Sequence, residues 1–324
     1  MATNLKEGQN GVKSPASSGP SISPMKDSPA VERALSRSKL YLLLSWSYLY
    51  PEDDEFLDYV QSGEFVEDGR AALESLRAAL GDQLSQLNDE AKESLDEIET
   101  HLSDIEHWSS SEGINWNIQD LRDEHRRVFS NVIALDCPPY ETLFGNDHVF
   151  GQSYVMGDIS GFYTAFGLQL SQDIHERLDH LSVELEFLHY LAYKESYALC
   201  HDGKEKVQTV VDAEKKFVKD HIGRWVPLFS GMLKKKADYG FYKSIADFTS
   251  AWVNFEINFL SVSPQPYSET DYRPANFVNP EGQSFECGAQ DKGNELSLLM
   301  NEVGAQDFLD KEKQDQGQGK SGTA

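Results

Sequence analysis

The sequence predicts an all-α fold, a single-domain helical bundle with disordered N- and C-terminal tails. Three observations support this prediction. Apolar side chains between residues 30 and 260 recur at steps of three and four, which is typical of helices with one buried face. Alternating apolar and polar stretches, which would indicate strands, are absent from this region. Both ends of the chain are rich in Pro and Gly and poor in large apolar side chains, so they bury too little surface to offset the entropy of ordering.

The chain therefore divides into three segments. Residues 1–29 are expected to be a disordered N-terminal tail, and residues 30–260 a helical domain. Residues 261–324 are expected to be a mostly irregular acidic tail, rich in Pro and Gly. Within that tail, the amphipathic stretch Glu295–Leu309 is expected to form a short helix.

Start and stop signals place the helices of the domain. The first is expected over Ala30–Tyr50, because Pro51 cannot continue a helix. Asn117 is expected to cap a helix over Ile118–Phe129, and a loop containing Pro and Gly follows over Asp136–Gly151. The other helices are expected over Asp54–Gln61, Gly69–Leu80, Ser85–Ser109, Ser153–Phe166, Gln172–Cys200, Lys206–Lys236 and Phe241–Leu260.

The segment Gln172–Cys200 carries an apolar row and a second row beside it. The first row consists of Ile174, Leu178, Leu181, Leu185, Leu188 and Ala192. The second row, beside it, consists of His180, Glu184, Phe187 and Leu191. Since two rows require neighbours on more than one side, this helix is expected to lie at the centre of the bundle.

The charge balance restricts the class of partner. The chain has 29 basic and 54 acidic residues and a net charge of -25. Such a surface repels phosphate backbones, so no nucleic-acid partner is expected, whereas a peptide rich in Arg or Lys would be attracted. Solubility or adaptation to salt is an alternative explanation of the same charge.

The sequence favours a cytoplasmic location. The N-terminus MATNLKEGQN has no apolar segment typical of a secretory signal. The longest apolar stretch, Leu40–Tyr50, is too short to span a bilayer, so no stable membrane insertion is expected. The cysteines Cys137, Cys200 and Cys287 form no C-x-x-C motif, so neither a zinc ribbon nor a disulfide framework is indicated.

Motifs for catalysis or metal binding are weak. His180 and Glu184 lie one helical turn apart, and Glu186 and His189 form a Glu-x-x-His pair. Di-iron bundles need a second Glu-x-x-His and two further glutamates, and no second copy occurs. Cys137 lies in a Pro-containing loop that would expose its thiol, but no base is placed beside it in the sequence. We therefore expect no catalytic residue, no metal and no resident cofactor.

The loop Cys137–Gly145 has the composition of a peptide-binding surface. Two prolines stiffen it and present Tyr140 and Glu141 in a fixed pose. Aromatic rings beside a carboxylate suit an arginine-bearing peptide, through cation–π contacts and bidentate pairing. Three more aromatic residues follow, Phe144, Phe150 and Tyr154. The alternative is that these rings only complete the core at the helix ends.

Four blocks of the sequence resemble the TorD/DmsD/NarJ group of redox-enzyme maturation chaperones. They are Ser38–Pro51, Asp136–Gly145, Arg177–Phe187 and Phe217–Phe229, the last followed by Phe241 and Tyr242. The resemblance spans about residues 32 to 260, in the same order as in the family, and excludes both tails.

The resemblance implies a function. Such a protein is a cytoplasmic chaperone, not an enzyme. It binds the twin-arginine leader, or the N-terminus, of the catalytic subunit of a molybdenum oxidoreductase. It assists insertion of the molybdenum cofactor and delays export until the subunit is mature. Two alternatives stay open: a metal-dependent enzyme built on a helical bundle, and a structural subunit of a redox complex.

The resemblance also implies binding residues. Asp179 and His180 match the Asp-His pair of the family's leader-binding region, and Glu184 completes a D-H-x-x-x-E pattern. The family's aromatic-x-x-Leu-Phe helix aligns with His125–Phe129. The chain departs from the family at Leu178, where Pro is usual, and at His125 and Val128. The full predicted leader-binding set is His125, Phe129, Tyr140, Glu141, Asp179, His180, Glu184 and Phe187. Replacing both Asp179 and His180 by Ala is expected to weaken leader binding at unchanged melting temperature.

Overall fold

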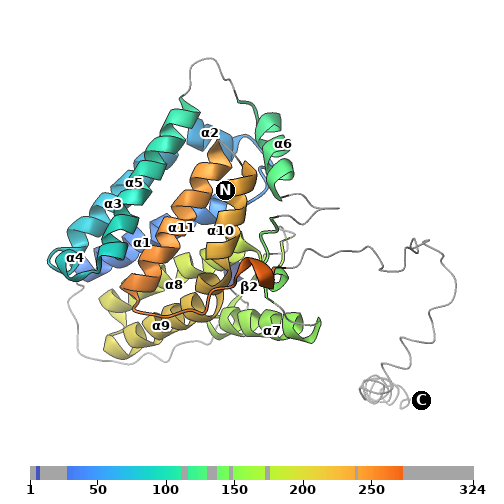
Figure 1. The fold of residues 1–324 in the computed structure, drawn as a ribbon. Coiled ribbons are helices and arrows are strands. Elements are labelled where there is room, and N and C mark those ends of the chain that lie inside the picture. Colours follow the sequence, from blue (N-terminus) through green and yellow to red (C-terminus); the bar gives the residue numbers. More distant parts are fainter. Residues whose placement is uncertain are drawn as a thin grey trace, which may run out of the picture. The chain divides into compact units, whose positions relative to one another are not determined.

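The computed structural model describes residues 5–7, 28–110, 116–129, 137–145, 149–171, 176–237 and 240–272. The fold is the predicted all-α bundle (Figure 1). The longer helices are α1 (Pro29–Ser47), α3 (Glu64–Leu80), α5 (Asp89–Ser109), α6 (Ile118–Phe129), α7 (Val149–Ala165), α8 (Leu181–His201), α9 (Lys204–Phe217), α10 (Gly223–Ala237) and α11 (Phe241–Phe259). Two shorter ones are α2 (Glu55–Gln61) and α4 (Gln83–Gln86). The predicted helix Glu295–Leu309 and most of both predicted tails lie outside the described residues.

The helices pack as a succession of neighbours (Figure 1). Helix α1 packs between α3 and α8, and α11 packs between α5 and α10. Helix α9 covers the outer side of α8. Every side chain of α8 from Leu181 to Leu188 is buried, which confirms that this helix lies at the centre of the bundle.

Local capping sets several helix boundaries. The Ser28 side chain accepts a hydrogen bond from the Ala30 amide, so α1 begins at Pro29. The predicted helix Ser85–Ser109 is interrupted, because Asn88 caps a new helix by accepting from the Ala91 amide at 2.9 Å. The predicted Asn117 cap is confirmed, since its side chain accepts from the amides of Gln119 and Asp120.

The predicted helix Gln172–Cys200 was placed too early. Helix α8 begins only at Leu181, and His180 is its N-cap in extended conformation. The Leu181 amide donates to the Pro139 carbonyl at 2.9 Å, so the chain before α8 pairs with the preceding loop instead of continuing the helix. Leu178 therefore lies in a turn, outside the apolar row assigned to it.

The predicted helix Lys206–Lys236 is also interrupted. Its middle, Val218–Ile222, forms a π-helical turn (η2) between α9 and α10. Pro227 has no amide hydrogen to donate to the Gly223 carbonyl four residues earlier, so the regular hydrogen-bond pattern weakens at this place. Widened turns of this kind often accompany functional sites, and this one carries His221.

Two three-residue strands fall where none was predicted. Strand β1 (Leu5–Glu7) pairs antiparallel with β2 (Leu168–Leu170). The Leu5 side chain is buried, and its amide donates to Glu186 Oε1 at 3.2 Å. The prediction of disorder therefore fails for these three residues, because a single leucine anchors them on the bundle.

The first residues of the predicted C-terminal tail pack on the bundle. Residues 261–272 follow α11 as an extended segment that packs on the bundle. The Tyr267 amide donates to the Arg224 carbonyl at 2.8 Å, and Tyr272 forms a β-bridge with Phe144. A Cβ on Gly223 would lie 2.6 Å from a Pro264 carbon, so only glycine permits this approach.

A buried ionic cluster ties four helices together. Arg37 on α1 donates to Glu195 on α8, Glu214 on α9 and Glu256 on α11, at 2.7 to 2.9 Å. We call these four residues the Arg37 cluster. Within the described ranges, no helix is long and apolar enough to cross a membrane.

Candidate functional site

Asp179 holds the loop Cys137–Gly145 against the start of α8. Its side chain is fully buried. Asp179 Oδ2 accepts from the Thr142 amide at 3.1 Å, from the Thr142 hydroxyl at 2.6 Å and from Arg177 Nη2 at 2.8 Å. The Asp179 carbonyl also accepts from the Glu141 amide. Asp179 therefore fixes the pose that the loop presents.

His180 joins the same loop to α8. Its Nδ1 accepts from the Ser182 amide at 3.2 Å, and its ring packs edge-on against Tyr140 at 5.1 Å between centroids. Burial lowers the pKa of His180 to about 3, and the nearby His125 and Arg177 lower it further. His180 is therefore neutral at physiological pH and acts as a helix cap and ring partner.

A chain of polar groups runs from the core to the surface. Trp225 Nε1 donates to Glu184 Oε2 at 3.0 Å. Glu141 lies beside Glu184, and its carboxylate is 3.0 and 3.1 Å from Nδ1 of His221. Nε2 of His221 lies 3.3 Å from Oδ2 of Asp158, whose side chain is 38 % exposed. We call Tyr140, Glu141, Asp179, His180, Glu184 and His221 the loop cluster.

Glu184 lies beside the carboxylate of Glu141. Burial raises the pKa of Glu184 well above the usual value, and the charge of Glu141 and a hydrogen bond to that carboxylate raise it further. The raised pKa favours the protonated form of Glu184, which reduces the repulsion between the two glutamates.

The predicted residues on α6 form a separate aromatic group. His125 packs on Phe129 at 4.7 Å and on Tyr50 at 5.3 Å between centroids. Burial lowers the pKa of His125 to about 4, so this ring is also neutral. Phe129 stacks on Phe229 at 6.4 Å, and Phe229 reaches the loop through Phe144 at 6.3 Å. The group is therefore linked to the loop through core rings, and His125 also interacts electrostatically with His180.

Phe187 does not line a surface groove. It is fully buried on α8 and packs against Phe162, Tyr163 and Phe217. It contributes to the core behind His221, whose ring lies 4.8 Å from that of Phe217. In the described conformation a peptide cannot contact Phe187 directly.

The predicted leader-binding residues differ in their exposure to solvent. Asp179, His180, Glu184, Glu141, Phe129 and Phe187 are buried, whereas Tyr140 and His125 are partly exposed. Tyr140 and His125 are thus the two members of the predicted set that reach the surface in the described conformation. Because Asp179 accepts three hydrogen bonds, its replacement by Ala would also lower the melting temperature, so the predicted double Ala variant is a poor probe of binding.

Four residues of this region were not predicted from the sequence. His221 and Trp225 complete the buried chain, and Thr142 and Arg177 complete the surroundings of Asp179. His221 and Arg177 fall within the blocks that carry the family resemblance, but spacing alone gave no reason to join them to the loop.

The Glu-x-x-His pair, Glu186 and His189, makes contacts that do not involve a metal ion. The Glu186 carboxylate accepts from the Leu5 amide, and the His189 ring lies 2.8 Å from Ser38 Oγ. Across the described ranges, no three His, Cys, Asp or Glu side chains are arranged to hold a metal ion. Cys137, expected to expose its thiol, is buried, with Sγ 3.9 Å from the Phe229 carbonyl oxygen.

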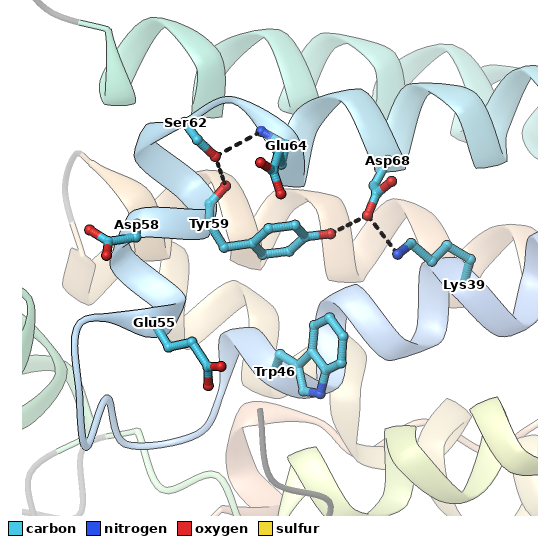
Figure 2. Close-up of a pocket in the computed structure, with 8 residues that line it drawn as sticks. All are labelled: Lys39, Trp46, Glu55, Asp58, Tyr59, Ser62, Glu64 and Asp68. Atoms are coloured by element: carbon cyan, nitrogen blue, oxygen red, sulfur yellow. Dashed lines mark hydrogen bonds and ion pairs between the residues drawn. The ribbon is translucent and has the colours of Figure 1, made fainter.

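A pocket lies elsewhere on the bundle, among α1, α2 and α3. Its volume is about 510 Å³, and Figure 2 shows the eight side chains that line it. Asp68 accepts from the Tyr59 hydroxyl and pairs with the Lys39 ammonium at 2.6 Å. The other carboxylates of the lining are Glu55, Asp58 and Glu64. None of the predicted leader-binding residues lines this pocket, so it provides an independent acidic surface for comparison.

Comparison with known proteins identifies the family. The family model described as nitrate reductase delta subunit matches residues 64–230, about half of the chain. The chain belongs to the nitrate reductase delta subunit family. This confirms the TorD/DmsD/NarJ resemblance. The matched part of the chain contains the loop cluster.

Several relatives in this family are named as chaperones. The perchlorate reductase assembly chaperone of Dechloromonas aromatica is 24 % identical over 70 % of this chain and 94 % of its own length. The chaperone TorD of Photobacterium profundum is 25 % identical over 41 % of this chain, and the chain spans 60 % of its length. The chlorate reductase assembly chaperone of Ideonella dechloratans is 34 % identical over 26 % of this chain and 42 % of its own length.

Proposed function

We propose that this chain is a cytoplasmic assembly chaperone for the catalytic subunit of a molybdenum oxidoreductase. It binds the twin-arginine leader or N-terminus of that subunit, assists insertion of the molybdenum cofactor and delays export until maturation. The observation that carries the proposal is the similarity to the perchlorate reductase assembly chaperone over 94 % of that protein's length. It acts by binding and not by catalysis.

The loop cluster supports a peptide-binding role. It presents one aromatic ring, Tyr140, at the rim of a buried and acidic interior. Burial and the Glu176 carboxylate raise the pKa of Tyr140 to about 12, so its ring stays neutral and suits cation–π contact. The loop that carries Tyr140 is fixed by Asp179 and by two prolines, so little entropy is lost when a peptide binds.

Calorimetric titration tests the proposal. The purified chain is titrated with a synthetic leader from the molybdenum-enzyme catalytic subunit encoded nearest in the genome. We expect saturable binding with a Kd in the micromolar range or tighter, and weaker binding of a version with lysines in place of the two arginines, because lysine lacks the planar fork of donors. Absence of binding to the leader and to the subunit's whole N-terminal segment would contradict the proposed function.

Two variants locate the binding surface. Tyr140→Ala removes the partly exposed ring and is expected to raise the Kd about tenfold, equivalent to about 1.4 kcal/mol. The matched control is Asp58→Asn, which removes one charge from the separate pocket of Figure 2 and should leave the Kd unchanged. The opposite pattern, loss of binding in Asp58→Asn alone, would move the binding surface to α1–α3.

A further inference from the structure

The buried carboxylate of Asp179 is already occupied by an arginine of this chain. Arg177 Nη2 donates to Asp179 Oδ2 at 2.8 Å and to Thr142 Oγ1 at 2.7 Å. The Arg177 guanidinium carbon lies 4.8 Å from the centroid of the Tyr140 ring. A carboxylate, a hydroxyl and an aromatic face are the elements from which proteins build a site for a peptide arginine.

The internal arginine fills this site incompletely. Only one nitrogen of Arg177 contacts Asp179, and Asp179 Oδ1 is buried without a hydrogen bond from any residue that the structure describes. Arg177 precedes Asp179 by only two residues, which restricts how its guanidinium can approach the carboxylate. An arginine that arrives from another chain is free of this restriction and can pair with both oxygens.

Arg177 can be exchanged for another arginine. Its side chain is 46 % exposed, so rotation about its own bonds brings the guanidinium into water. Asp179 is fully buried, so loss of Arg177 without a replacement would cost more than the about 0 to 1 kcal/mol of an exposed pair, whereas an incoming arginine restores the charge balance. Asp179 would keep the two hydrogen bonds from the Thr142 amide and hydroxyl, so the loop would stay in place.

We propose that Asp179, Thr142 and Tyr140 form a binding site for a peptide arginine, and that Arg177 is an internal competitor that a bound peptide's arginine displaces. The identity of the peptide as a client leader rests on the proposed function above. The arginine site itself rests on the observed geometry of Arg177. Competition from Arg177 thereby raises the Kd of an arginine peptide, so that only peptides with further favourable contacts are retained.

A double-mutant cycle tests the displacement. Arg177→Ala and the unaltered protein are each titrated with the leader peptide and with a version whose arginines are replaced by alanine. If Arg177 occupies the site about nine-tenths of the time, its removal tightens binding of the arginine peptide about tenfold. The alanine peptide gains nothing, so the ratio of the two Kd values increases about tenfold.

Two controls accompany the cycle. Arg177→Lys keeps the charge and should give an intermediate affinity. Arg70→Ala removes a partly exposed arginine paired with Glu99 and Glu106, which should change neither Kd. Thermal unfolding verifies that each variant is folded. Equal weakening of both peptides in Arg177→Ala, or an unchanged ratio of Kd values, would show that Arg177 is a permanent brace and overturn the proposal.

A small probe separates this inference from the proposed function. N-acetyl-arginine amide should bind Arg177→Ala saturably and raise its Tm, with a smaller effect on the unaltered protein and none from the lysine analogue. If this result is obtained and the leader peptides fail to bind, the arginine site is supported and the proposed client leader is rejected. Failure of the probe to discriminate arginine from lysine in Arg177→Ala would reject the site, whatever the leader does.

Discussion

The molecule buries carboxylates in two regions, and the two are built differently. The Arg37 cluster is closed: Arg37 and its three glutamate partners lie on four helices, and each is at most 6 % exposed. The loop cluster is open at two edges, where Arg177 is 46 % exposed and Asp158 is 38 % exposed. The first has a buried arginine at its centre, whereas the second has a histidine, His221, against the carboxylate of Glu141 and a half-exposed arginine at its edge.

This difference separates stability from binding. A buried ion pair with all partners fixed joins elements, and removal of one partner leaves an uncompensated buried charge. Where a cluster reaches water at its edge, an incoming charged group can replace one partner, so that no buried charge is left uncompensated. We therefore expect variants of the Arg37 cluster to change the free energy of unfolding, and variants at the rim of the loop cluster to change peptide affinity.

The largest effect is expected for Arg37→Met. Three glutamates lose their common partner, so the free energy of unfolding should fall by about 3–5 kcal/mol, measured by urea denaturation at pH 7. The control Arg70→Met removes an arginine whose ion pairs are exposed, and it should cost at most about 1 kcal/mol. Equal losses in both variants would show that burial does not distinguish the two sites.

A pH-dependent effect, smaller within any one pH unit, is expected for Glu214→Gln. Burial raises the pKa of Glu214 to about 8 from its ordinary 4.5, against the lowering effect of Arg37. The folded state thus holds a proton that the unfolded state releases above pH 4.5, so the unaltered protein loses stability as the pH rises from about 4.5 to about 8.

Glu214→Gln should lack this loss. Its free energy of unfolding relative to the unaltered protein should increase with pH by up to about 1.4 kcal/mol per pH unit across that range. Denaturation series at pH 5, 6.5 and 8 measure the slope. Parallel curves for the two proteins would mean that Glu214 titrates near its usual value in the folded state.

Sequence reasoning predicted the bundle because the evidence for it is local and repeated. Apolar spacing identified nearly all helices, and side-chain capping by Asn117 followed from one residue and its neighbours. It failed at the start of α8, because the apolar row continues through Leu178 while the backbone does not. The contact that ends the helix there, from the Leu181 amide to Pro139, joins segments about 40 residues apart.

The candidate site was predicted in part for the same reason. The loop and the Asp-His pair are each continuous in sequence, so the resemblance located Tyr140 and His180. The roles of Arg177 and His221 depend on which residues lie next to Asp179 and Glu141 in space, and no periodicity encodes that. Likewise, the prolines after Ser261 indicated an irregular tail, but not that Tyr267 would attach it to α10.

The smallest effect we expect at neutral pH is at His180, and its pH dependence has the opposite sign to that of Glu214. The pKa of His180 is about 3 in the folded state and 6.5 in the unfolded chain, so the unfolded state binds a proton first as the pH falls. The stability that the neutral His180 contributes is present above pH 6.5 and is lost progressively between pH 6.5 and about 3.

His180→Ala should cost about 1 kcal/mol at pH 7 through loss of the cap, whereas His180→Asn should recover most of it, because Asn is a favourable N-cap. Both variants should be less acid-sensitive than the unaltered protein in denaturation series between pH 7 and 4. If His180→Asn lost stability on acidification as steeply as the unaltered protein, then the acid sensitivity would belong to His125, whose pKa is about 4, and not to the loop cluster.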